Sequence, residues 1–259
     1  MRGFAVLLRK ELLESWRTLR LPVVVGLFLL VGLLSPLTAR FLPEIIEAAA
    51  GDTLGSFPIP PPTTADAVDQ LVKNLGQFGA LAAILLAMGS VANETERGTA
   101  AFILAHPVDR GAFLGAKAAA IGIVLAVAVA SAVTIGWLYT SILFEPVPIG
   151  GWIAMGGLVW LALAAWAALT FLASTVTGSA IAAAGLGFVG LLVLSIAAVI
   201  PAVARVTPAG LTGPALAIAG GPATIDQAST DVWRPVVATA LWIAGALAIA
   251  ALTFRRREI

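Results

Sequence analysis

The chain has 259 residues, of which 60% are hydrophobic and only 11% are charged, and its mean hydropathy is +1.01. A soluble domain carries about 25% charged residues, so this composition predicts an integral membrane protein. The chain has no cysteine, which excludes disulfides and thiolate metal sites. It also has no basic patch away from its ends, so no nucleic-acid partner is expected.

Residues 2–20 predict an amphipathic helix. Apolar side chains recur there at a spacing of three or four residues, and charged side chains fill the positions between them: Phe4, Leu8, Leu12, Trp16 and Leu19 form the stripe. A basic helix with such a stripe lies well in the plane of the membrane interface. We prefer this interpretation to the alternative, a solvated leader whose periodicity is incidental.

Six apolar stretches follow, each about long enough to cross a hydrocarbon core of roughly 30 Å. They cover residues 21–39, 74–92, 118–140, 151–173, 179–200 and 235–254. Residues 40–73 predict an outer loop, because Pro43, Pro58 and Pro60–Pro62 interrupt them, with a short helix over 44–50. We therefore predict an all-α integral membrane protein with one transmembrane domain over residues 1–259, an amino-terminal interfacial helix and six spans.

Residues 201–234 predict the second outer loop. Within it, residues 208–219 are apolar but are too short and too interrupted by glycine and proline to span a membrane. Two interpretations fit this piece equally: an interfacial or re-entrant segment, or a covered loop on the outer surface.

The positions of lysine and arginine predict the orientation, because short cytoplasmic segments are enriched in both. With the amino terminus inside, the inner segments hold eleven of these residues and the outer segments four. The outer loops also collect eight of the fourteen carboxylates. Both termini are therefore predicted to be cytoplasmic.

Within the boundaries given above, the six spans contain no ionisable side chain. Such groups mark proton relays and ion-coupled sites inside membranes. Their absence argues against a proton-driven carrier and against an intramembrane protease. The fifth span carries closely spaced small residues, which serve either packing within the chain or a face for a second copy: Ala182, Gly185, Gly187 and Gly190.

Residues 93–117 form a polar island between the second and third spans. Gly98 stands where the chain must turn, and Thr99 is in position to cap a short helix over residues 100–105. Pro107 ends that helix, and Asp109 caps a further helix that runs into the third span. The sole histidine, His106, has neither a cysteine nor a second histidine to join it, so we expect no metal site there.

Two interpretations of the polar island are open, a docking element for a partner protein and an ordinary loop. An apolar patch over residues 102–104, beginning at Phe102, suits the groove of a partner protein. The alternative is an ordinary loop whose charges face water, and the chemistry of the residues favours neither.

Several motifs resemble those of the ABC type-2 permeases. The island contains Glu94-x-Glu96-Arg97-Gly98-Thr99, then Pro107-Val108-Asp109-Arg110 and Gly115-Ala116-Lys117, similar to the family's loop between spans two and three. Arg9-Lys10-Glu11-Leu12 resembles the R-K-E-L of the family's elbow helix, and residues 254–259 resemble its carboxyl-terminal ending. Residues 35–45 are similar to the branch that includes the permease of nitrous oxide reductase maturation.

This resemblance implies the permease subunit of an ATP-driven exporter in a bacterial or archaeal cell membrane. Two copies would form a homodimer, with the path near the first and fifth spans. A separate ATP-binding subunit, holding ATP and magnesium, would dock on the elbow helix and the loop. The implied docking residues are Arg9, Lys10 and Glu11 in the elbow, and Glu94, Glu96, Arg97, Gly98, Thr99, Phe102, His106, Pro107 and Arg110 in the loop.

The chain itself is expected to be no enzyme and to bind no cofactor. A P-loop needs a glycine-rich turn that ends in Lys-Ser or Lys-Thr, and none of the three lysines, Lys10, Lys73 and Lys117, sits in one. Two alternatives to an exporter subunit are a nucleotide-independent lipid or amphiphile carrier, or scramblase, and a membrane scaffold that recruits a cytoplasmic partner without transport. Lipids, amphipathic peptides and apolar drugs all suit a path without ionisable groups.

Overall fold

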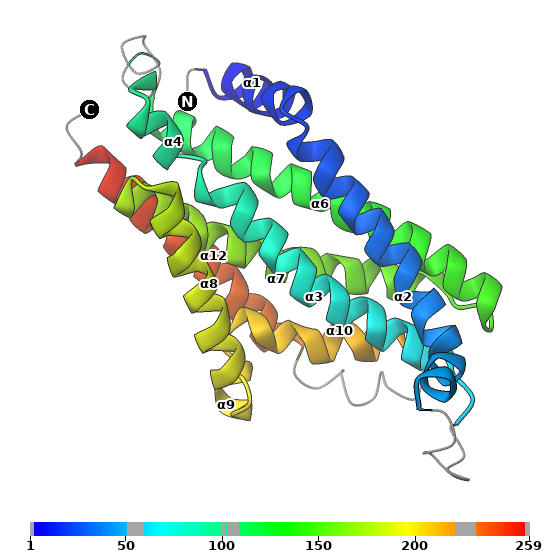
Figure 1. Ribbon diagram of the computed structural model, residues 1–259. Helices are drawn as coiled ribbons and strands as arrows, with labels where there is room; N and C mark the ends of the chain where they lie inside the picture. Colours follow the sequence, from blue (N-terminus) through cyan, green and yellow to red (C-terminus); the bar gives the residue numbers. More distant parts are fainter. Residues whose placement is uncertain (1–2, 51–59, 100–101, 103–108, 221–231, 257–259) are drawn as a thin grey trace.

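The computed structural model describes residues 3–50, 60–99, 102, 109–220 and 232–256, and every regular element in these ranges is a helix (Figure 1). Six helices are long and apolar enough to cross a membrane, which confirms the predicted fold class. They are α2 (Arg20–Ala50), α3 (Thr64–Met88), α6 (Arg110–Leu143), α7 (Ile149–Thr177), α8 (Ala180–Ala197) and α12 (Trp233–Arg255). Five short elements accompany them in the described part of the chain: α1 (Phe4–Arg17), α4 (Ala92–Glu96), α9 (Pro201–Ala204), η2 (Pro208–Leu211) and α10 (Thr212–Ala219).

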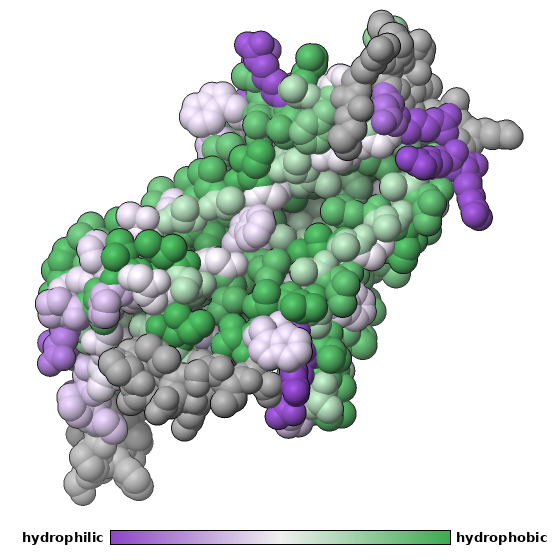
Figure 2. Space-filling view, turned by 180° about the vertical axis from the view of Figure 1, so that it is seen from behind, coloured by the Kyte–Doolittle hydropathy of each residue, from purple (hydrophilic) through white to green (hydrophobic). Residues whose placement is uncertain are grey.

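An even number of spans places the two ends of the chain on the same side of the bundle, and the helices are arranged in this way. The start of α1, the short helix α4 and the end of α12 lie toward one end of the bundle, and α9 lies toward the other (Figure 1). Hydrophobic residues cover the middle of the face seen in Figure 2, while hydrophilic residues gather toward the two ends. We call the end that carries α1 and α4 the proximal end; its cytoplasmic location stays a prediction.

Helices extend from both sides into residues 40–73, so more of the predicted outer loop is helical than the sequence indicated, and its outer location stays a prediction. The α2 helix continues through Pro36 and Pro43 to Ala50, so the short helix expected over 44–50 is its last part. A proline inside a membrane helix is tolerated where neighbouring groups satisfy the freed backbone. On the other side, Thr63 and Asp66 form a capping box that starts α3 ten residues before the expected span.

Helices α2 and α6 approach each other closely where both carry glycine. A Cβ atom added at Gly32 of α2 would lie 2.5 Å from the carbonyl oxygen of Ala132 on α6. One added at Gly136 of α6 would lie 3.4 Å from the carbonyl oxygen of Gly32. Small residues allow membrane helices to pack at such short range. The two helices are therefore fixed against each other through their backbones.

The segment from η2 to α10 is a folded part of the second loop, packed mainly against α7. Pro208, Leu211, Ala215 and Ala219 are buried. A Cβ atom added at Gly151, near the start of α7, would lie 2.5 Å from the carbonyl oxygen of Ile218. The apolar residues over 208–219 thus cover the bundle, and whether they enter the bilayer stays a prediction.

The small residues of α8 that the sequence analysis named lie in two different environments. Gly187 is buried, and a Cβ atom there would collide with Thr170 of α7, so this glycine serves packing within the chain. Ala182 and Gly185 are exposed, and Gly190 is half-buried with open space beside it. These three residues are the part of the predicted face that remains available to a second copy.

Candidate functional site

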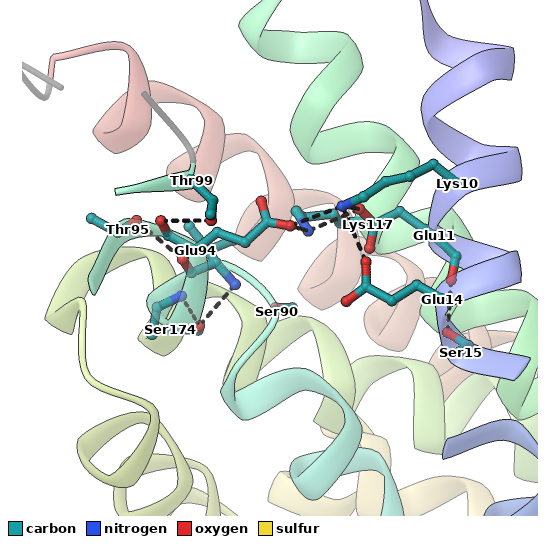
Figure 3. Close-up of polar contacts among 12 residues, drawn as sticks. Lys10, Glu11, Glu14, Ser15, Ser90, Glu94, Thr95, Thr99, Lys117 and Ser174 are labelled. Carbon is teal, nitrogen blue, oxygen red and sulfur yellow. Dashed lines mark hydrogen bonds and ion pairs between the residues drawn. The ribbon is translucent and has the colours of Figure 1, made fainter. Parts of the chain in front are cut away.

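Five charged side chains from three elements meet at the proximal end, and we call them the ion-pair cluster (Figure 3). The cluster consists of Lys10, Glu11 and Glu14 of α1, Glu94 of α4 and Lys117 of α6. The Lys117 Nζ atom lies 2.8 Å from Glu94 Oε1 and 3.0 Å from Glu11 Oε1. The Lys10 Nζ atom lies 3.0 Å from the same Glu94 oxygen, and 3.0 Å from Glu11 and 3.1 Å from Glu14.

Burial makes Lys117 the centre of this cluster. Its side chain is 4% exposed, against 16% for both Glu11 and Glu94 and 40% for Lys10. The Lys117 ammonium also lies 5.2 Å from the centroid of the Phe113 ring, within cation–π range. A buried charge is tolerated only when it is paired, and removing one partner from such a pair is strongly destabilising. The cluster therefore ties α1, α4 and α6 together.

Lys10 remains charged in this environment. Burial alone would lower the pKa of Lys10, but the hydrogen bonds to Glu11 and Glu94 outweigh that effect and hold the pKa above its usual range. Two ammonium groups thus stabilise the Glu94 carboxylate, one supplied by the first helix of the chain and one by the third spanning helix.

The short helix α4 is fixed from its other end by α7. The Ser174 hydroxyl oxygen accepts hydrogen bonds from the backbone N–H groups of Val91, at 3.3 Å, and Ala92, at 3.1 Å (Figure 3). Both donors are buried at the start of α4, where a helix leaves N–H groups without partners. Glu94 is thereby held in place by the backbone as well as by its ion pairs.

The turn after α4 has the shape that its sequence predicts. Gly98 has a φ of 69°, a left-handed conformation that favours glycine. The Thr99 hydroxyl donates a hydrogen bond to the Glu94 carbonyl oxygen at 3.2 Å; its capping of a helix over residues 100–105 stays a prediction. Glu96, Arg97 and Phe102 are exposed. His106 and Pro107 lie outside the described residues, and of the short helix predicted over residues 100–105 only Phe102 is described; its backbone N–H group donates to the Gly98 carbonyl oxygen at 3.4 Å.

Arg110 is placed against the end of α12. Its guanidinium donates to the carbonyl oxygen of Arg255 at 3.1 Å and to that of Phe254 at 3.5 Å. A cation at a helix carboxyl terminus interacts favourably with the helix dipole. The rings of Phe113 and Phe254 stack nearby, with centroids 5.6 Å apart. Asp109 caps α6 as predicted, by accepting a hydrogen bond from the Gly111 N–H group at 2.9 Å.

The structure brings together Lys10, Glu11 and Glu94 from the predicted docking set, whereas Arg9 lies exposed on another side of α1. The sequence interpretation missed Lys117, Glu14 and Ser174 as members of this site. It also placed all ionisable residues outside the third span, but α6 begins at Arg110 and carries Lys117 in its third turn. The signal available in the sequence was a single lysine that opens a long apolar run.

The three carboxylates of the cluster have ligand oxygens within 4.8 Å of one another, a spacing that would suit a metal ion. The two lysines already neutralise two of these three charges through bonds of 3.1 Å or less. The arrangement is thus built as a lysine–glutamate cluster that connects three helices.

This geometry defines a multi-pass membrane protein with an ion-paired junction at one end of its bundle. Residues 5–259 match the family model described as "ABC-2 family transporter protein". The chain is also 31% identical over 195 residues to the "Uncharacterized transmembrane protein YxlG" of Bacillus subtilis (strain 168). The aligned region covers 72% of this chain and 73% of that protein. The chain belongs to the ABC-2 transporter family.

Proposed function

We propose that the chain is the permease subunit of an ATP-driven exporter whose ATP-binding subunit docks at the proximal end. The ion-pair cluster carries this proposal, because it joins the surface helices α1 and α4 to the spanning helix α6 through Lys117. A force applied to α4 from outside the membrane would be passed to α6 through these bonds and to α7 through Ser174. The membrane location, the family and the sequence without a P-loop support this role.

In this proposal a second copy of the chain completes the path. The exposed positions Ala182 and Gly185 of α8 support a homodimer, because small residues allow two helices to approach. Transport runs outward across the cell membrane, the amino terminus lies inside, and ATP and magnesium are bound by the partner subunit.

A cavity of about 610 Å³ between α3, α7, α8 and the segment from η2 to α10 is the candidate substrate chamber. Its wall is mainly apolar, with Trp166 and Phe188 among the residues that line it. Lys73, Gln77 and Ser195 add polar groups to this wall. Apolar cavities with a few polar groups are typical of small-molecule sites. The chamber suits an apolar or amphipathic substrate.

Replacing Gly76 with leucine should block this chamber without harming the fold. Gly76 lines the cavity, and a Cβ atom added there meets no atom within 4 Å. Leucine also favours the helix over glycine by about 1 kcal/mol. We expect ATP-dependent uptake of a fluorescent amphiphile, such as Hoechst dye, into inside-out vesicles to fall severalfold while thermal stability is kept. Gly26→Leu on α2, where a Cβ atom also meets open space, is the matched control; equal uptake by both variants would argue against the chamber.

The exporter proposal is tested by purifying the tagged chain from its own membrane in mild detergent. We expect a P-loop subunit to copurify and the complex to hydrolyse ATP, whereas the isolated chain does not.

Gly98→Leu should uncouple hydrolysis from transport, because it strains the turn after α4 by about 1–2 kcal/mol while a Cβ atom there meets no neighbour. Lipid movement in liposomes that contain the chain alone would favour a carrier or scramblase instead. A retained partner without any flux would favour a scaffold.

A further inference from the structure

A second cavity, of about 360 Å³, lies between α1, the start of α2, α3, α4 and residues 117–124 of α6. The ion-pair cluster forms its polar end, and Leu86, Ile121 and Val124 line its apolar end. Ile121 and Val124 lie four and seven residues beyond Lys117 along α6, which places them about 6 and 10 Å deeper along the helix axis. The cavity is therefore amphipathic along the direction of the spans.

Two arginines give this cavity an excess of positive charge. Arg20, at the start of α2, and Arg97, at the end of α4, both line it and are both exposed. Among the described residues, no carboxylate lies within ion-pair distance of either one. The lining contains four cations and three carboxylates, and the carboxylates are already bound by Lys10 and Lys117. The two guanidinium groups are thus available to an anion.

We propose that this cavity binds a phospholipid from the leaflet at the proximal end, with Arg20 and Arg97 on its phosphate and an acyl chain along Leu86, Ile121 and Val124. Arginine suits phosphate because its planar fork donates two parallel hydrogen bonds. The net positive charge favours an anionic head group such as phosphatidylglycerol over zwitterionic phosphatidylcholine. A bound lipid would connect the α1–α2 junction to α4 beside the ion-pair cluster. This lipid site is independent of any ATP-binding subunit.

The test uses the purified chain in detergent and native mass spectrometry with phosphatidylglycerol and phosphatidylcholine added in equal amounts. We expect the wild-type chain to retain phosphatidylglycerol preferentially. The double variant R20Q/R97Q should retain it about tenfold less, because each lost bond involves two charged groups. Arg17→Gln is the matched control, since Arg17 is an exposed arginine of the same region that does not line the cavity. Thermal unfolding of each variant confirms that it is folded.

Unchanged retention by R20Q/R97Q would overturn the proposal, as would an equal loss in Arg17→Gln. Inorganic phosphate distinguishes a lipid site from a simple anion site. If millimolar phosphate leaves the lipid bound, the acyl chain contributes as proposed; if phosphate displaces it fully, the cavity is an anion site and the lipid assignment is wrong. Equal retention of phosphatidylcholine would contradict the role given to the excess charge.

Discussion

Replacing Lys117 with methionine is expected to lower the free energy of unfolding by about 3–5 kcal/mol, the usual cost of breaking a buried ion pair. The substitution keeps the apolar stem of the side chain but leaves Glu94 and Glu11 near each other with Lys10 as their shared cation. Lys117 is 4% exposed, so water replaces the lost ammonium group less well than it would at the surface. Equilibrium unfolding in mixed detergent micelles measures the change.

Lys73→Met is the matched control for this prediction. Lys73 forms an ion pair with Asp69 at 2.6 Å, but its side chain is 63% exposed. Exposed pairs of this kind contribute about 1 kcal/mol or less. Equal losses of unfolding free energy in the two variants would show that the burial of Lys117 does not strengthen its ion pairs. A double-mutant cycle that combines Lys117→Met with Glu94→Gln isolates the contribution of the Lys117–Glu94 pair. The double variant should lose less free energy of unfolding than the sum of the losses in the two single variants.

Gly32→Leu is expected to force α2 and α6 apart and to destabilise the bundle by about 1–3 kcal/mol or more, the range observed for overpacked cores. The new Cβ atom would lie 2.5 Å from the Ala132 carbonyl oxygen and 2.9 Å from the Ala132 Cα atom. Both are backbone atoms of α6, so no side-chain rotation relieves the collision. The same unfolding measurement reports the loss.

Gly26→Leu provides the comparison within the same helix. A Cβ atom added at Gly26 meets no atom within 4 Å, so this variant changes the volume of α2 without touching α6. It should be as stable as the wild type or slightly more stable, because leucine favours a helix. If Gly26→Leu and Gly32→Leu unfold alike, the close crossing of α2 and α6 does not limit stability.

The spanning helices were predictable because membrane crossing depends on length and hydropathy, which a sequence displays directly. The ends of α2 and α3 were not, because Pro43 and the charges around it suggest a loop when tertiary contacts are unknown. Local pairs support the helix there: Arg40 approaches Glu44 at 3.9 Å, and Asp69 pairs with Lys73 one turn apart. Proline removes one hydrogen bond, and the rest of the helix compensates for it.

The candidate site was predictable only in part. Resemblance pointed to Lys10, Glu11 and Glu94, but not to the bonds among them, because those bonds depend on how α1 packs beside α6. Lys117 was placed at the end of the polar island, just before the predicted third span. Its burial follows from the carboxylates of two other helices, which no local pattern reveals. The docking role predicted for Arg110 stays a prediction, but its contacts with the last carbonyls of α12 could not be predicted from the sequence, because they join residues about 145 positions apart.

The ion-pair cluster also sets an order of events during biosynthesis. Lys10 bonds to a residue 84 positions later in the chain, and Glu11 to one 106 positions later. At about 5–20 residues per second, a ribosome needs roughly 5–20 s to make that stretch. Through this interval the charges of α1 have no partner on α4 or α6, while its apolar stripe and its connection to α2 keep it near the bilayer. The bonds that fix α1 in the cluster can form only after Lys117 of α6 has been synthesised.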